Sequence, residues 1–79
     1  MALFVRDHKG KVVTLQTKAS DSVRNAKLEV ENLIGIPIDR QLLHFAGRLL
    51  PNDSTLASGG VRDGSTLHLI LLLLGGAAY

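Results

Sequence analysis

The side chains of this sequence that could take part in chemistry are first of all its histidines, His8, His44 and His68. They lack a nucleophile partner, and the absence of cysteine excludes a cysteine nucleophile, a thiolate zinc site and a disulfide framework. The seven acidic residues are scattered, and no glycine-rich phosphate loop follows a strand. The sequence therefore predicts no catalytic residues, no metal site, no cofactor and no enzymatic activity.

A second chemical feature is the pair Gly75 and Gly76, which follows a run of residues, 67–74, that is apolar except at His68. The run is long enough for a buried strand and too short to span a bilayer, so we expect no membrane segment. Because glycine has no Cβ, the chain leaves the fold at Gly75 and Gly76 as a thin thread that could enter a narrow channel. We expect a folded domain over residues 1–74 and a flexible tail over residues 75–79.

Length and composition restrict the class of protein. The chain has 79 residues, 46% of them hydrophobic and 20% charged, with a formal net charge of +2, which predicts one small folded domain. The nine Lys and Arg residues are spread singly, and one Tyr and two Phe offer little base stacking, so we expect no nucleic acid partner. The N-terminus does not have the pattern of a secretion signal, so a cytoplasmic or nuclear location is expected.

These features must be positioned by an α+β fold. Leu3 and Val5 alternate with Phe4 as in a half-buried strand, which leaves Phe4 outside. Oxygens of Asp21 and Ser22 can cap a helix over residues 23–34. Residues 56–59 predict a single helical turn. We expect a mixed sheet of four to five strands with this one main helix packed across it, the strands being residues 1–7, 11–17, 40–45, 48–50 and 66–72.

Short motifs recur at characteristic spacings along the whole chain, among them Phe4–Val5, Gly10–Lys11, Thr14–Leu15, Gly35–Pro37, Phe45–Gly47, Ser65–Leu69 and Gly75–Gly76. In these motifs the chain resembles the ubiquitin family. The resemblance implies the β-grasp (ubiquitin-like) fold, in which the first and last strands lie parallel at the centre of the sheet.

The resemblance implies a protein modifier whose carboxylate at Gly76 is joined to lysine amines of other proteins. Residues 77–79 block that carboxylate, so a processing protease would remove them before activating and conjugating enzymes act. Two alternatives remain. The chain resembles in part, as at Gly60–Val61, the cleaved leader of a ribosomal protein fusion, and it could be a non-covalent interaction module that binds ubiquitin-like receptors.

The sequence differs from that of ubiquitin at positions that the resemblance implies are recognised by the activating enzyme. Leu42, Leu72 and Leu74 stand where ubiquitin has arginines, and leucine cannot replace a long cationic donor. One interpretation is a different activating partner with an apolar site, and the other is a protein that is no longer conjugated. Exposed leucines also predict weak self-association.

The resemblance places the partner-binding surface at His8, His44, Gly47, His68 and Ile70, beside Leu42 and Leu72. His44 and His68 are expected to be cross-strand neighbours. Three hypotheses follow: a face whose binding weakens as pH falls through about 6 to 7, adventitious binding of a transition metal, or solvated surface histidines without a special role. Under each hypothesis, receptors that require aliphatic side chains at the centre of the partner-binding surface should bind poorly.

Acceptor lysines and the core also differ from ubiquitin. Only Lys11 and Lys27 remain at acceptor positions, which predicts a tag that does not form the usual chains, because the other positions hold Arg6, Glu29, Leu33, Arg48 and Asp63. Smaller core residues at Thr17, Ala26 and Gly59 predict a less stable fold, with a melting temperature below about 90 °C.

Overall fold

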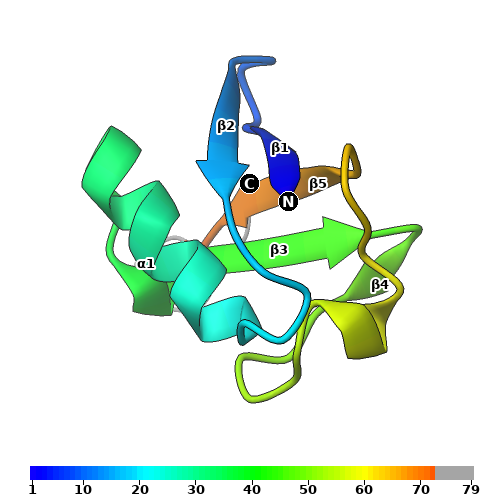
Figure 1. Ribbon diagram of the computed structural model, residues 1–79. Helices are drawn as coiled ribbons and strands as arrows, with labels where there is room; N and C mark the ends of the chain where they lie inside the picture. Colours follow the sequence, from blue (N-terminus) through cyan, green and yellow to red (C-terminus); the bar gives the residue numbers. More distant parts are fainter. Residues whose placement is uncertain (73–79) are drawn as a thin grey trace.

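The computed structural model describes residues 1–72, and its centre is a pair of parallel strands, β1 (Ala2–Arg6) and β5 (Thr66–Leu71) (Figure 1). The sheet has five strands in the order β2-β1-β5-β3-β4, and every neighbouring pair other than β1 and β5 is antiparallel. The prediction of a mixed sheet with parallel first and last strands is therefore confirmed. The other strands are β2 (Val12–Gln16), β3 (Gln41–Phe45) and β4 (Arg48–Leu49).

Alternation along the central strands separates a core face from an open face. Leu3 and Val5 of β1 and Leu67 and Leu69 of β5 are buried, whereas Phe4 is 37% exposed, as the sequence pattern predicts. Because successive side chains of a strand point to opposite sides, the two central strands together place four aliphatic side chains on the side that the helix covers. The open face of the sheet is then free to carry polar residues.

Helix α1 (Val23–Ile34) crosses the core face of the sheet (Figure 1) and has the predicted bounds. Ser22 caps its first turn, since the Ser22 hydroxyl accepts a hydrogen bond of 3.1 Å from the backbone N–H of Asn25. Gly35 ends it with a φ of 80°, a left-handed conformation that glycine adopts without steric cost. Val23, Ala26 and Val30 are the aliphatic residues that the helix buries in the core.

Two short 3₁₀ helices flank the β3–β4 hairpin. One is η2 (Ala57–Gly59), which corresponds to the predicted helical turn, and the other is η1 (Ile38–Arg40), which the sequence analysis did not predict. The η1 turn is closed by a hydrogen bond of 3.0 Å from the N–H of Arg40 to the carbonyl of Pro37. As a result β3 begins at Gln41, one residue later than expected.

Thr17, Ala26 and Gly59 are the three positions at which small residues were expected to weaken the core. Thr17 and Ala26 are buried as predicted, whereas the space beside Gly59 is filled by a neighbouring side chain. Ala26 is fully buried, and Thr17 is buried with a hydroxyl that has no hydrogen-bond partner among residues 1–72. The expectation of lost volume at Gly59 is wrong, because a Cβ there would lie 2.8 Å from Cδ2 of Leu50. Leu50 fills that space, and Nη2 of Arg48 donates a hydrogen bond to the Gly59 carbonyl.

Lys27 connects the helix to the rest of the core. Its side chain is only 4% exposed, and Nζ donates a hydrogen bond of 2.5 Å to Oδ1 of Asn52. Its carbonyl accepts a hydrogen bond from Nε2 of the buried Gln41. Burial lowers the pKa of Lys27 below that of an ordinary lysine, because the charged ammonium loses contact with water.

We expect the substitution Thr17→Val to raise the free energy of unfolding by about 1 kcal/mol, because it replaces a buried hydroxyl that has no partner with a methyl group of similar size. Urea denaturation monitored by circular dichroism measures the change. The control is Thr14→Val, in the same region but exposed, for which a change within about 0.5 kcal/mol is expected. Equal effects of the two substitutions would show that the buried hydroxyl is not the cause.

The substitution Asn52→Asp should raise the free energy of unfolding at pH 7 by about 1 kcal/mol, because it gives the buried Lys27 ammonium an anionic hydrogen-bond partner. The pairing would hold the pKa of the new carboxyl below its unfolded value. The added stability is therefore present above about pH 4 and lost as pH falls through the folded-state pKa. Urea denaturation between pH 2 and pH 8 tests this.

Lys27→Met is the matched background for that experiment. If Asn52→Asp stabilises the Lys27→Met protein as much as the parent, ion pairing is not the cause. The parent should also gain stability as pH rises toward about 10.4, because its unfolded state binds the lysine proton more tightly than the folded state does. This alkaline gain should be absent from the Lys27→Met protein.

Candidate functional site

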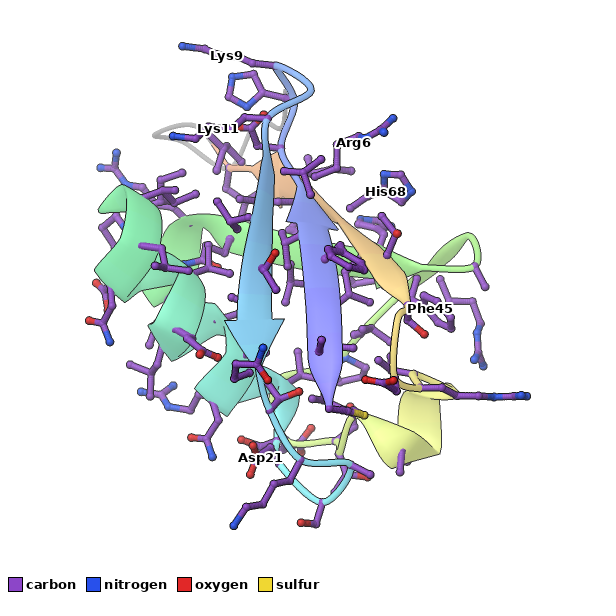
Figure 2. All side chains as sticks on the ribbon, turned by 45° about the horizontal axis from the view of Figure 1, so that its top comes forward. Arg6, Lys9, Lys11, Asp21, Phe45 and His68 are labelled. Atoms are coloured by element: carbon purple, nitrogen blue, oxygen red, sulfur yellow. The ribbon has the colours of Figure 1, made fainter. Side chains whose placement is uncertain are left out.

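The open face of the sheet carries a row of polar side chains across its middle. His44 and His68 lie directly opposite each other on β3 and β5, as predicted. On the other side of His68 lies Arg6 of β1, and Figure 2 shows these two side chains on the same side of the sheet. Leu49 of the edge strand β4 pairs with His44 and ends the row. The centre of this face therefore carries the guanidinium of Arg6 beside two imidazoles, and it is bounded by the aliphatic side chain of Leu49, which is 50% exposed.

The third histidine, His8, is exposed in the turn between β1 and β2, outside the paired strands. The strand register thus joins His44 and His68, and the membership of His8 in the same surface stays a prediction. That turn is organised by Asp7, whose Oδ1 accepts hydrogen bonds of 2.9 Å from the N–H groups of both Lys9 and Lys11.

An aliphatic groove lies next to the histidines, at the end of the sheet where β5 finishes. Leu42 is the register partner of Ile70, and the N–H of Leu72 donates a hydrogen bond of 2.8 Å to the carbonyl of Arg40. Leu42, Leu72 and Leu49 line one shallow groove together with Pro51. Two of the leucines that stand in place of ubiquitin's arginines therefore line the same groove. The groove can bind an apolar side chain of a partner but offers no cation at either position.

Gly47 forms the tip of the β3–β4 hairpin with Ala46. Both have positive φ, 53° at Ala46 and 78° at Gly47, which is the backbone conformation of a tight two-residue hairpin turn. Gly47 is exposed, and a Cβ there would have no atom within 4 Å, so its conformation and not its surroundings favours glycine. The turn sets the register that brings Leu49 opposite His44.

The two candidate acceptor lysines differ in access. The Lys11 side chain is exposed directly before β2, whereas the amine of Lys27 is buried against Asn52. Lys11 is therefore the accessible member of the pair, and a reaction at Lys27 would need local opening of the fold. The predicted conjugation site, Gly75 and Gly76, and the whole of the tail 75–79 lie outside the described residues.

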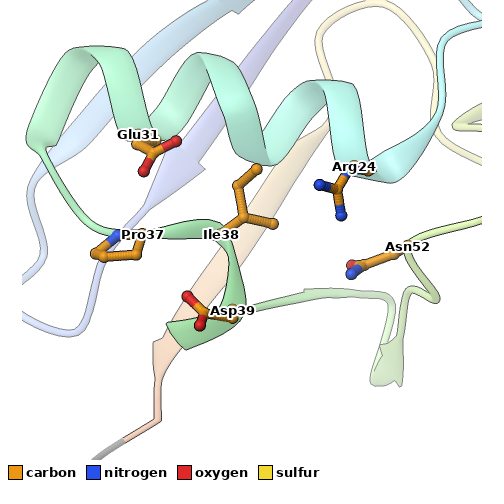
Figure 3. Close-up of a pocket in the computed structure, with 6 residues that line it drawn as sticks. All are labelled: Arg24, Glu31, Pro37, Ile38, Asp39 and Asn52. Atoms are coloured by element: carbon orange, nitrogen blue, oxygen red, sulfur yellow. The ribbon is translucent and has the colours of Figure 1, made fainter.

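A second pocket adjoins the aliphatic groove and shares Ile38, Asp39 and Asn52 with it. It is formed between α1, η1 and the loop after β4, with Ile38 at its centre and Arg24 and Asn52 on one side (Figure 3). Glu31 and Asp39 supply carboxylates on its other side. Its charges are mixed, and none of these side chains is fully buried.

Sequence reasoning missed two members of the site, Arg6 and Leu49. The parallel register of β1 and β5 places Arg6 beside His68, and this cannot be read from local periodicity. Leu49 could have been found, because it precedes the buried Leu50 in a short strand and alternation then directs it outward.

The described residues were expected to hold neither a metal site nor a membrane segment. Among residues 1–72, histidines and carboxylates do not gather in a group of three or more that could hold a metal ion. None of the helices in this part of the chain has the length and apolar character needed to cross a membrane.

Comparison with known proteins agrees with this architecture. The model of the ubiquitin family matches residues 3–74. The chain is 36% identical to Ubiquitin-like protein 1 of Schizosaccharomyces pombe over 98% of this chain and 99% of that protein, and 33% identical to Ubiquitin-like protein NEDD8 of Dictyostelium discoideum over 96% and 99%. It is also 35% identical to a part of phosphatidylinositol 4-kinase gamma 4 of Arabidopsis thaliana, over 81% of this chain and 12% of that enzyme. With its β-grasp fold and a family match over nearly its whole length, the chain belongs to the ubiquitin family.

Proposed function

We propose that this chain is a ubiquitin-like modifier that is conjugated through Gly76 after a protease removes residues 77–79. The observation that carries the proposal is the extent of its similarity to small ubiquitin-like proteins, which covers 99% of the Schizosaccharomyces pombe and Dictyostelium relatives. In this proposal the domain supplies no catalytic group and acts by being attached to other proteins and then recognised.

In the proposed reaction the Gly76 carboxylate attacks ATP and forms an acyl adenylate, with release of pyrophosphate. A cysteine thiol of the activating enzyme then displaces AMP to give a thioester. The amine of a target lysine finally displaces the thiol and forms an amide bond. The partner enzymes supply the nucleophile and the electrostatic stabilisation, and this chain supplies a slender acyl group and a surface for recognition.

The aliphatic groove argues for an activating enzyme that differs from that of ubiquitin. Leu42 and Leu72 lie in one groove with Leu49, so both positions that hold cationic donors in ubiquitin present aliphatic side chains here, in a groove that Asp39 and Asn52 also line. An enzyme that recognises this surface would bury aliphatic groups against it, and each buried methylene is worth about 0.8 kcal/mol. Lys11 is the exposed candidate for attachment of a further copy.

A second candidate function is a non-covalent interaction module. The observation that favours it is the similarity to one segment of a much longer kinase, of which this chain covers 12%. In that case receptors would bind the histidine row and the aliphatic groove, and Gly76 would have no role in binding.

The first test is expression of an epitope-tagged chain in its own cells, with intact-mass analysis and gel analysis of the products. We expect loss of the mass beyond Gly76 and heavier adducts, and we expect Gly76→Ala to abolish the adducts because processing and activation need an unbranched end. Tyr79→Ala is the matched control, since a residue removed by processing should not affect the adducts. An intact tail without adducts would contradict the modifier function and favour the module.

The second test concerns the choice of activating enzyme. With the chain ending at Gly76, the double substitution Leu42→Arg and Leu72→Arg should increase thioester formation with ubiquitin's activating enzyme at least about tenfold, as expected for one regained charged contact. Leu49→Arg adds one of these two charges to the same groove, at a different position, and should give no such gain. An equal gain with Leu49→Arg would mean that overall charge, and not these two positions, decides recognition.

A further inference from the structure

The outer edge of β2 is the longer of the two free edges of the sheet, and its backbone groups can be assigned from the strand register. The N–H of Thr17 bonds to the carbonyl of Met1, and the N–H of Asp7 bonds to that of Lys11. In an antiparallel ladder, hydrogen-bonded pairs alternate with pairs that are not hydrogen-bonded. Because the pairs Met1–Thr17 and Asp7–Lys11 are hydrogen-bonded, every second pair between them is hydrogen-bonded as well. The backbone N–H and C=O groups that point away from β1 are therefore those of Val12, Thr14 and Gln16.

One end of this edge is closed within the fold. The N–H of Gln16 donates a hydrogen bond of 3.2 Å to Oε1 of Glu29 on the helix, which confirms its outward direction. Val12 and Thr14 remain, both with exposed side chains, Val12 to 46%. In the described part of the chain no strand lies beyond β2. Such an edge can accept a further strand through main-chain hydrogen bonds.

The open end of the edge is positively charged. Lys9 and Lys11 are exposed there, and Figure 2 shows both at the end of the β1–β2 hairpin. The nearby carboxylate of Asp7 is engaged by two backbone N–H groups. At the other end, the carboxylate of Asp21 accepts a hydrogen bond from the N–H of Lys18, and the carboxylate of Glu29 accepts one from the N–H of Gln16. Acidic groups would therefore be favoured beside Lys9 and Lys11 and disfavoured beside Glu29.

A second copy of this chain fits the edge poorly. Antiparallel pairing of two β2 strands centred on Thr14 would place Gly10 and Lys11 of one copy opposite Lys18 and Thr17 of the other. Neither Lys11 nor Lys18 would then gain an acidic partner across the new pairing, so the pairing adds no favourable charge contact. Glu29 also holds the Gln16 N–H that the second copy would need.

We propose that the β2 edge binds an extended peptide that adds a strand beside Val12 and Thr14 and places acidic residues against Lys9 and Lys11. The main-chain bonds provide affinity, and the alternate side chains of the peptide pack on Val12 and Thr14. This site is independent of the proposed conjugation through Gly76.

The experiment is selection from a displayed library of twelve-residue peptides in which the central positions vary among Val, Ile, Thr and Leu and one flank varies among Asp, Glu, Lys and Ser. The full chain is the target. We expect enrichment of acidic flanks, and in the peptide complex we expect slowed exchange of the Val12 and Thr14 amide hydrogens. Lys11→Glu should weaken binding at least about tenfold, as loss of one charged contact does.

Thr14→Pro is the decisive variant, because it removes an outward N–H without taking a bond from the β1–β2 ladder, and proline is tolerated at such edge positions. Thr14→Ala keeps the N–H and is the matched control. Binding that survives Thr14→Pro, or no enrichment at all, overturns the proposal. So does a dimer of the chain in sedimentation equilibrium that is lost in Thr14→Pro. If that variant fails to fold, amide exchange in the unaltered protein decides alone: slowing at Val12 and Thr14 supports the site, and unchanged exchange there overturns it.

Discussion

The rest of the structure depends on the parallel pairing of β1 with β5, which joins the first strand of the chain to the last one described. This pairing closes a loop that contains almost the entire sequence, and the cost in chain entropy must be met by burial. Leu3 and Val5 meet Leu67 and Leu69 beneath the helix and provide much of that burial. The same register places Arg6 beside His68, so the core and the recognition face are set by a single alignment of two strands.

Features governed by local rules could be predicted from the sequence. Alternation put Phe4 outside and Val5 inside, and the caps Ser22 and Gly35 marked both ends of the helix, because each depends on a few neighbouring residues. The opposition of His44 and His68 followed from the family register.

Other features depended on residues distant in sequence and could not be read from it. The burial of Lys27 requires Asn52 to lie within reach of its amine, and the close fit at Gly59 requires Leu50 to fill the space. The short helix η1 depends on how the chain turns after Pro37. The tail that carries the predicted conjugation site lies outside the described residues, so its role rests on the proposal and its tests.

The direction of β1 and β5 also determines how the domain bears a mechanical load. When tension draws the start of β1 and the end of β5 apart, the two parallel strands are pulled lengthwise past each other, and their hydrogen bonds share the force in shear. A force applied across the strands would instead open those bonds one after another. A machine that pulls on the chain by its two ends would therefore meet the domain in its most resistant direction, although the domain itself is small.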